Sequence, residues 1–177
     1  ITKTVEAGEL LAGFGYDGQQ LNIGGLGVDG LSIIVEELNY LEDTRLRWHK
    51  SEDGWLTLGI QSANGEKRIL ALSPRNDDNT HTMHGIFIAK RGDPPKCRVL
   101  HQAISFDVAT AEAERMTAEY AIDTLVSKTA SWANRAATEG QIKYLRFLTG
   151  KRKFDDLTRG QASSLIDYHL AMRTIHG

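Results

Sequence analysis

Cysteine and long apolar runs are scarce in this sequence, and each scarcity excludes a class of protein. Cys97 is the single cysteine among 177 residues, which excludes an internal disulfide and leaves no second cysteine for a structural zinc site. We therefore expect a reducing compartment. No stretch approaches about 18 uninterrupted apolar residues, so no membrane-spanning helix is predicted. The first ten residues also lack the charged-then-apolar pattern of a signal peptide.

The sequence has no Gly-x-x-x-x-Gly-Lys-Ser/Thr loop of the kind that cradles the phosphates of ATP, so the chain alone is expected to hold no cofactor. Gly13 to Gly18 match the letters of a dinucleotide fingerprint, but no strand is recognisable before them and no helix after them. Residues 1–30 are instead interpreted as a glycine-rich lead-in or linker. The absent initiator methionine is typical of an excised or processed segment.

With 41% hydrophobic and 25% charged residues, the chain has the composition of a globular protein with one good core. Its net charge of −2 is unevenly distributed. Residues 132–161 hold seven Lys and Arg against three Asp and Glu, a net charge of +4, while the remainder carries −6. This asymmetry is the first indication of nucleic-acid binding, although basic helix faces are more often simply solvated.

The middle of the chain predicts an α+β fold with a mostly antiparallel sheet. Residues 55–60 and 67–72 flank Asn64-Gly65, a turn signal for a hairpin. Residues 84–90 and 97–106 flank the prolines at 94 and 95 and predict two more strands. Helical spacing over residues 110–127 predicts an amphipathic helix that covers the sheet. Residues 31–41 suit either a strand or a helix. We assign 31–130 to this β-rich module.

Residues 131–177 are predicted to form a basic C-terminal helical hairpin. Thr138 and Gln141, and again Thr158 and Gln161, have the spacing of a capping box, so each pair is expected to begin a helix. Gly150 stands where a left-handed helix end is wanted. Apolar positions then allow the two helices to pack against each other or against the sheet: Ile142, Leu145 and Leu148 in the first helix, and Ala162, Leu165, Ile166 and His169 in the second.

No catalytic or metal site is predicted. His81 and His84 lie in a segment with scattered histidines and lack carboxylate partners in a defined geometry, so a polar loop is the better interpretation. Cys97 lies in a predicted strand with no recognisable base beside it, and a small buried residue is the simpler interpretation.

The candidate nucleic-acid contacts are the basic residues around the junction of the two helices: Lys143, Arg146, Lys151, Arg152, Lys153 and Arg159. Cations near free helix amides suit a phosphate, but Lys151–Lys153 also suit the carbonyl end of the first helix. Tyr144, Phe147 and Phe154 alternate with these residues. Such side chains either stack on unpaired bases or pack within the helix pair.

The C-terminal pattern resembles a known family. Trp132, Ala136-Ala137-Thr138-x-x-Gln141 with Leu145, and Leu157-Thr158-Arg159-Gly160-Gln161-Ala162 with Leu165-Ile166 are similar to the C-terminal end of the fungal mitochondrial DEAD/DEAH-box DNA helicases that act on branched DNA. The resemblance covers residues 31–172 and is specific in its last third.

The resemblance implies an intracellular, mitochondrial appendage that grips DNA, while upstream motor lobes bind ATP and Mg²⁺ and supply hydrolysis. The chain would then be part of a helicase without being an enzyme by itself, and its oligomeric state stays open. The competing interpretation is a protein-interaction module that docks through the sheet face, for which an exposed apolar patch on the sheet would be the sign.

Overall fold

The computed structural model describes residues 28–89, 93–121, 123–154 and 156–177. The chain divides into two compact units, Ile1–Thr44 and Arg45–Gly177. In the first unit, α2 spans Val28–Asp43, so the segment 31–41, which suited strand or helix, is helical. The candidate fingerprint at residues 13–18 lies outside the described residues, as does most of the expected lead-in.

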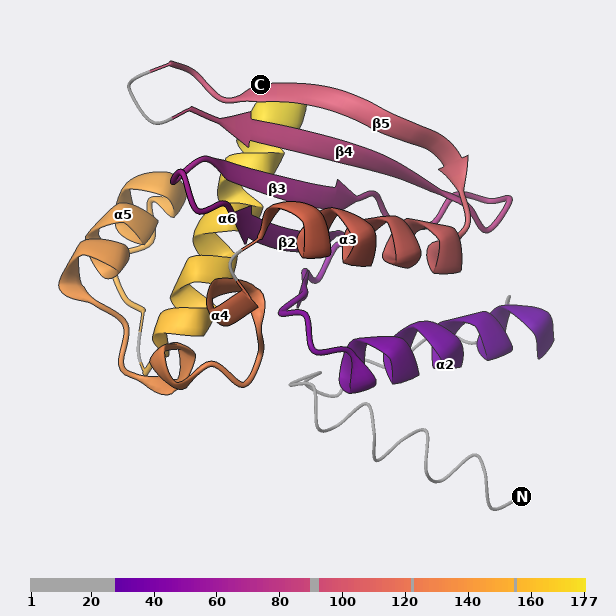
Figure 1. The fold of residues 1–177 in the computed structure, drawn as a ribbon, viewed down its shortest axis with the longest axis horizontal. Coiled ribbons are helices and arrows are strands. Elements are labelled where there is room, and N and C mark those ends of the chain that lie inside the picture. The colour runs from indigo at the N-terminus through magenta and orange to yellow at the C-terminus, as the bar shows by residue number, and fades with distance from the viewer. Residues whose placement is uncertain (1–27, 90–92, 122, 155) are drawn as a thin grey trace. The chain divides into compact units, whose positions relative to one another are not determined.

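The second unit is built on a five-stranded antiparallel sheet in the order β1-β2-β3-β4-β5 (Figure 1). The expected antiparallel sheet and the hairpin between β2 and β3 are confirmed, with Gly65 in the left-handed region at φ 81°. The strands are β1 His49–Lys50, β2 Leu56–Gln61, β3 Lys67–Leu72, β4 His81–Ile88 and β5 Lys96–Ile104.

Two details of the sheet differ from the sequence prediction. β4 begins at His81 instead of residue 84, because the hairpin closes there: the Ser73 amide donates to the Thr82 carbonyl at 2.9 Å, and the His81 ring bonds the Ser73 carbonyl. A fifth strand, β1, was not predicted. Only two residues of β1 pair with β2, which is too short a run to show alternation in the sequence.

Helices cover both faces of the sheet. Ile69, Leu70, Ala71 and Leu72 of β3 are all fully buried, and successive strand residues point to opposite faces, so both faces need a cover. The expected helix over residues 110–127 is in fact α3, Phe106–Tyr120, and a separate short α4, Asp123–Val126. The break comes at Ala121, whose backbone is extended.

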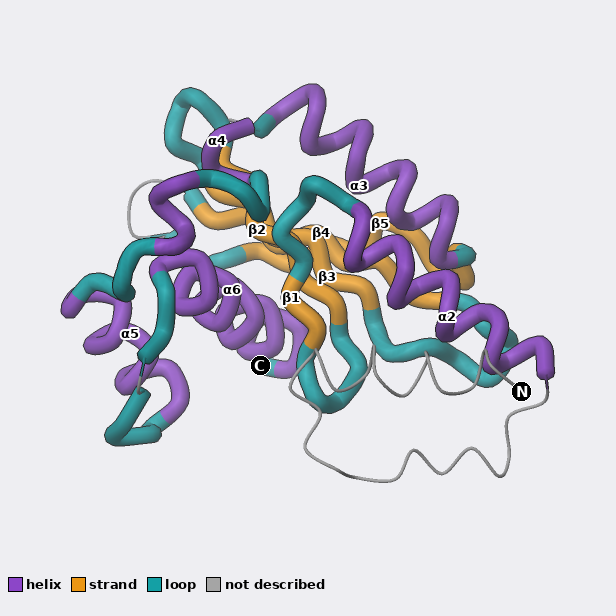
Figure 2. The backbone as a smooth tube through the Cα atoms, turned by 90° about the horizontal axis from the view of Figure 1, so that it is seen from below, coloured by secondary structure: helices purple, strands orange, loops and turns teal. Residues whose placement is uncertain are grey.

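The second cover is the last helix, α6, Arg159–His176. A hydrophobic cluster joins it to Trp55, Ile69 and Ile86 on the sheet through Ala171, Tyr168, Leu170, Met172 and Ile175. Figure 2 shows α3 and α6 on opposite sides of the strands. The sequence left open whether the C-terminal helices pack on each other or on the sheet, and α6 does both.

The two helices of the expected C-terminal hairpin are confirmed, but they do not run antiparallel as in a hairpin. α5 spans Glu139–Thr149 and follows a 3-10 turn, Ser131–Asn134. Both capping boxes are present, and Gly150 ends α5 at φ 71°. A β-bridge between Ala136 and Thr158 holds the two helix starts side by side. α5 and α6 therefore run in broadly the same direction, and the return segment, residues 150–154 and 156–157, lies between the end of α5 and the start of α6 (Figure 1).

A buried ion pair also fixes α6 on the sheet. The carboxylate of Asp167 is buried and pairs with the Lys67 ammonium of β3. Gly59 of β2 lies directly beneath Asp167, since a Cβ at this position would overlap the carboxylate. Nearby, the Arg47 guanidinium lies 4.4 Å from the centre of a Trp132 ring and donates to the Leu125 carbonyl at 2.7 Å.

Candidate nucleic-acid interface

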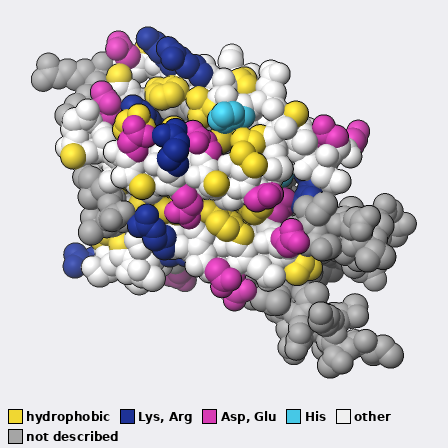
Figure 3. Space-filling view, turned by 45° about the vertical axis from the view of Figure 1, so that its right-hand side comes forward, with side chains coloured by type: hydrophobic (Ala, Val, Ile, Leu, Met, Phe, Trp, Pro, Cys, Tyr) yellow, Lys and Arg dark blue, Asp and Glu magenta, His cyan; other side chains and the backbone are white. Residues whose placement is uncertain are grey.

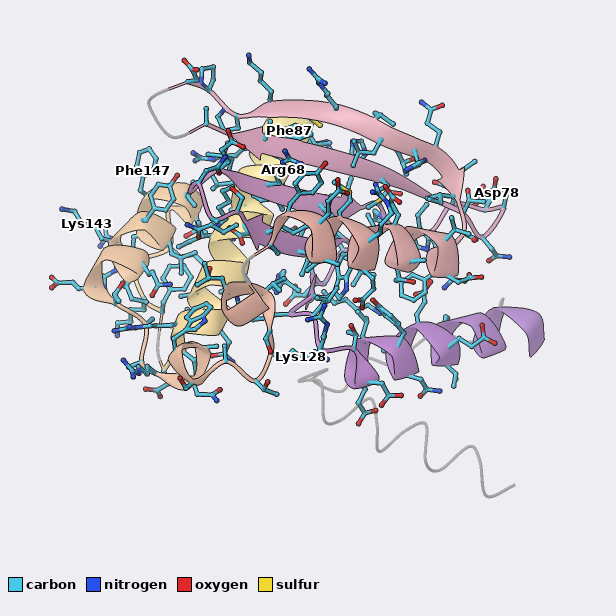
Figure 4. All side chains as sticks on the ribbon, in the orientation of Figure 1. Arg68, Asp78, Phe87, Lys128, Lys143 and Phe147 are labelled. Atoms are coloured by element: carbon cyan, nitrogen blue, oxygen red, sulfur yellow. The ribbon has the colours of Figure 1, made fainter. Side chains whose placement is uncertain are left out.

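The packing of α5 decides which of its side chains meet solvent. Leu145 and Leu148 lie three residues apart and are buried against the rest of the unit. The opposite side of the helix carries Lys143 and Arg146, which are both exposed. In Figure 4, Lys143 and Phe147 point outward from α5. The helix thus presents a basic outer side because its leucines are used for packing.

The basic run Lys151–Lys153 begins where α5 ends. The Gly150 amide donates to the Arg146 carbonyl at 2.9 Å, and the left-handed backbone at Gly150 turns the chain out of the helix. The Lys151 amide donates to the Thr149 hydroxyl at 3.1 Å, and Lys151, Arg152 and Lys153 are all exposed. Their charges lie beside the carbonyl end of α5, where cations are favoured.

Arg159 lies at the other end of the helix pair. Its amide donates to the Arg135 carbonyl at 2.7 Å, and its carbonyl accepts from Gln141 Nε2 at 3.1 Å. The side chain is half-buried, and its buried Nε has no hydrogen-bond partner. The structure therefore lines up five of the six predicted contacts along α5 and just beyond it. Arg159 lies near the start of both helices.

None of the six predicted contacts forms an ion pair with a carboxylate of the described residues. Arg115 of α3 shows the opposite arrangement, since Glu112 and Glu119 hold its guanidinium at 2.7 and 2.8 Å. Positive charges without internal partners attract an anion more strongly than charges that are already paired. The length of α5, about 16 Å, matches about five nucleotides of one DNA strand at 3.4 Å each.

Arg173 of α6 joins this surface, although no motif in the sequence pointed to this residue. Its guanidinium donates to the Leu148 carbonyl at 3.0 Å and lies 5.6 Å from the centre of the Phe147 ring. Burial lowers the pKa of His169, and the positive charges of Lys151 and Arg173 lower it further. Those two cations, one just beyond the end of α5 and the other in α6, therefore act on the same imidazole.

The aromatic side chains near this surface divide into two kinds. Tyr144 and Phe147 are exposed on α5, and their rings are nearly parallel, with centroids 6.2 Å apart and an interplanar angle of 12°. Phe154 is half-buried in the return segment. Tyr144 and Phe147 are therefore exposed enough to stack on a base, whereas Phe154 is partly packed.

The other candidates from the sequence do not form a site. His81 is buried, whereas His84 lies against Trp55 with 5.8 Å between ring centroids. Cys97 is half-buried in β5, with its Sγ 3.8 Å from His84 Nδ1, and burial raises the pKa of this thiol. In the described part of the chain, no group of three or more His, Cys, Asp or Glu side chains could hold a metal ion.

On the face shown in Figure 3, Lys and Arg side chains form separate groups, with Asp and Glu side chains and apolar patches between them. Mixed charge of this kind gives little net attraction for a polyanion. Compared with that face, the outer side of α5 with Lys151–Lys153 and Arg173, which we call the α5 basic surface, is better suited to nucleic acid.

The residues that carry the sequence resemblance mostly build the scaffold beneath this surface. Trp132 stacks against Arg47, and the Thr138 and Thr158 boxes begin the two helices. Gly160 packs against Ala133, where a Cβ would come within 3.0 Å of the alanine methyl. The residues that define the family pattern thus determine where the two helices start. Most of the candidate contacts lie between these two starts in the sequence.

The comparison with protein families gives a match over most of the chain. The family described as "Mitochondrial helicase Irc3, C-terminal domain" matches residues 37–174. Neither a curated protein nor a solved structure matches the chain. Among the described residues, no helix is both long enough and apolar enough to cross a membrane.

Proposed function

The chain belongs to the family of C-terminal domains of the mitochondrial helicase Irc3, and from this premise we propose that it is the part of a helicase that grips DNA. Motor lobes elsewhere in such a protein would bind ATP and Mg²⁺ and supply the hydrolysis, and the chain by itself hydrolyses no ATP. A mitochondrial location follows from the helicase for which the family is named. Branched DNA is the substrate class that the sequence resemblance implies.

The observation that carries the proposal is the α5 basic surface. Its Lys and Arg side chains have no carboxylate partner among the described residues, and they flank two exposed aromatic rings. Lys and Arg that are free of internal partners provide the sequence-independent affinity of proteins for the phosphate backbone. Arg159 is the least accessible of the six proposed contacts, because its side chain is half-buried.

Docking of a protein partner through the sheet face has less support. α3 and α6 cover the two faces, and Val99 is the one large hydrophobic residue of the described strands that is exposed. A protein-docking face of stable affinity needs a contiguous apolar patch of several hundred Å². The described sheet offers β5 as an edge, with charged Lys96 and Arg98 on it.

A salt titration of DNA binding by the purified chain tests the proposal. If about four of the six cations meet phosphates, the plot of log K against log salt concentration should have a slope of about −3 to −4. Replacement of Lys151, Arg152 and Lys153 by Ala should weaken binding to all sequences and flatten the slope.

The matched control replaces Lys50, Lys96 and Arg98 by Ala, which removes the same charge from exposed positions on the sheet. The control should keep the slope and nearly all of the affinity. Equal losses in both triple variants would mean that overall charge, and not the α5 basic surface, determines binding. Unchanged affinity and slope in the Lys151–Lys153 variant, with native circular dichroism, would overturn the proposal.

A further inference from the structure

The exposed aromatic pair on α5, Tyr144 and Phe147, suits a ligand that has a flat apolar part as well as a phosphate. Phe147 is 71% exposed, the largest value for any large hydrophobic residue in the described part of the chain, and Tyr144 is 40% exposed. Single exposed apolar residues are common on protein surfaces. Here, however, two rings lie nearly parallel on one side of a helix whose leucines are already buried, so packing of this helix does not require either ring.

The neighbours of the pair are cations. Arg173 lies over the Phe147 ring, and its hydrogen bond to the Leu148 carbonyl holds the guanidinium in place. Lys143 and Arg146 each precede one of the two aromatic residues in α5. The one acidic residue of this helix, Glu139, is in its first turn. A ligand at the rings would thus meet a flat apolar surface bordered by positive charge.

An unpaired nucleotide has both complementary features, a flat π-face and an adjacent phosphate. In a duplex the base faces are covered by neighbouring base pairs, whereas a single strand leaves them open to aromatic side chains. We propose that Tyr144 and Phe147 form a stacking site for an unpaired base of single-stranded DNA, with Arg146 and Arg173 beside its phosphates. This inference rests on the proposed DNA-binding function and adds to it the state of the strand that α5 recognises.

The stacking site predicts a preference that the phosphate contacts alone do not. Lys and Arg contacts bind the backbone of either single-stranded or duplex DNA, whereas ring stacking adds affinity only for unpaired bases. Arg173 would act on both parts of the ligand, because its position over Phe147 leaves guanidinium N–H groups that can donate to a phosphate. The flanking cations also favour a nucleotide over an apolar protein segment as the occupant.

The test compares Phe147→Ala with wild type on two probes: an oligothymidine that carries one 2-aminopurine, and a blunt duplex of the same length. Stacking on an aromatic ring quenches the fluorescence of 2-aminopurine. In the purified chain, Phe147→Ala should weaken oligothymidine binding by about 10-fold, within the range for loss of one stacked base. Duplex binding should change less than twofold, the quenching should disappear, and Phe147→Trp should restore both affinity and quenching.

Two controls separate stacking from other effects. Val108→Ala removes an exposed apolar side chain from α3 and should change neither probe. The salt slope of Phe147→Ala should equal that of wild type, because no phosphate contact is lost, whereas the Lys151–Lys153 variant should flatten it.

The outcomes also separate this inference from the function on which it rests. Unchanged oligothymidine affinity and quenching in Phe147→Ala, together with weakened binding by the Lys151–Lys153 variant, would overturn the stacking site and leave DNA binding standing. Loss of binding to the helicase motor lobes in Phe147→Ala, with both DNA probes unaffected, would overturn it in favour of a protein contact. No salt-dependent DNA binding by wild type would overturn the proposed function itself.

Discussion

Lys67 of β3 pairs with the buried carboxylate of Asp167 in α6, so a single ion pair ties the last helix to the middle of the sheet. Burial raises the pKa of the Asp167 carboxyl, and the positive charges of Lys67 and Arg47 oppose that rise. Because α6 also carries Arg173, the position of the α5 basic surface depends on how α6 is held. Stability and binding are therefore linked through a pair of residues that contact no part of that surface.

Replacement of Lys67 by Met should lower the free energy of unfolding by about 3–5 kcal/mol near neutral pH, because it leaves a buried carboxylate without its partner. Urea denaturation measures this loss. Lys96→Met, at an exposed position of β5, is the control and should change the free energy by less than about 0.5 kcal/mol. A loss no larger than that of the control would show that Asp167 is compensated elsewhere.

The loss in Lys67→Met should shrink as the pH falls. The pKa of Asp167 is raised in the folded state, so the folded chain binds this proton more readily than the unfolded chain does. The contribution of Asp167 to stability is then fully present below the ordinary pKa of an aspartate and is lost as the pH rises through the folded-state pKa. A protonated Asp167 needs no ammonium partner, so the variant and wild type should converge in acid. A loss that is constant from neutral pH to about pH 4 would contradict this account.

Gly59 and Gly140 should respond to alanine in opposite ways. A Cβ at Gly59 overlaps the Asp167 carboxylate, so Gly59→Ala should destabilise the protein by about 1–3 kcal/mol, the usual cost of overpacking. At Gly140, in the first turn of α5, the nearest atom to a Cβ is the Thr138 hydroxyl oxygen at 3.9 Å. Gly140→Ala should therefore stabilise by about 0.5–1 kcal/mol. Thermal unfolding measured by circular dichroism gives the change in stability of each variant. A change of the same sign in Gly59→Ala and Gly140→Ala would contradict this explanation by packing.

As the N-cap of α6, Thr158 should contribute about 1 kcal/mol to the free energy of unfolding. Its hydroxyl accepts a hydrogen bond from the Gln161 amide at 3.2 Å, and the Gln161 side chain accepts one from the Thr158 amide at 2.9 Å. Thr158→Ala removes the first bond and leaves a helix amide unpaired. Thr158→Ser keeps the oxygen and should retain nearly all of the stability in urea denaturation. Equal losses in the two variants would point to the methyl group instead of the cap.

Local signals in the sequence predicted the parts of the fold that depend on neighbouring residues. The two Thr-x-x-Gln boxes and Gly150 place the starts of α5 and α6 and the end of α5, because capping involves residues within one turn. Asn64 and Gly65 likewise mark the β2–β3 turn. The chemistry of each signal is complete within a few residues, so no knowledge of the tertiary fold is needed to read it.

The rest depends on contacts between residues far apart in the chain. Lys67 and Asp167 are a hundred residues apart, and nothing beside either one shows that α6 covers the sheet. Arg173 gains its place only through the Leu148 carbonyl and the Phe147 ring. The sequence identified the cations of the candidate surface but did not show that α5 and α6 start side by side, which separates Arg159 from Lys151–Lys153 along the helix pair.

DNA binding at the α5 basic surface should raise the pKa of His169. In the free protein, burial lowers this pKa, and the positive charges of Lys151 and Arg173 lower it further. A phosphate bound beside those two cations offsets their charge and so favours the imidazolium form. The complex then takes up a proton more readily than the free protein, so the affinity for DNA should increase as the pH falls through the pKa that His169 has in the complex.

NMR titration of the histidine ring protons, with and without a saturating oligonucleotide at low salt, measures the shift directly, and a His169→Gln variant assigns the resonance. His84 is the internal control, because burial and the charge of His176 lower its pKa and neither depends on the α5 basic surface. His169 should titrate at higher pH in the complex, while His84 should not move. An unchanged His169 pKa under conditions where DNA is bound would place the phosphates away from Lys151 and Arg173, since a phosphate beside those cations has to act on the imidazole that they already influence.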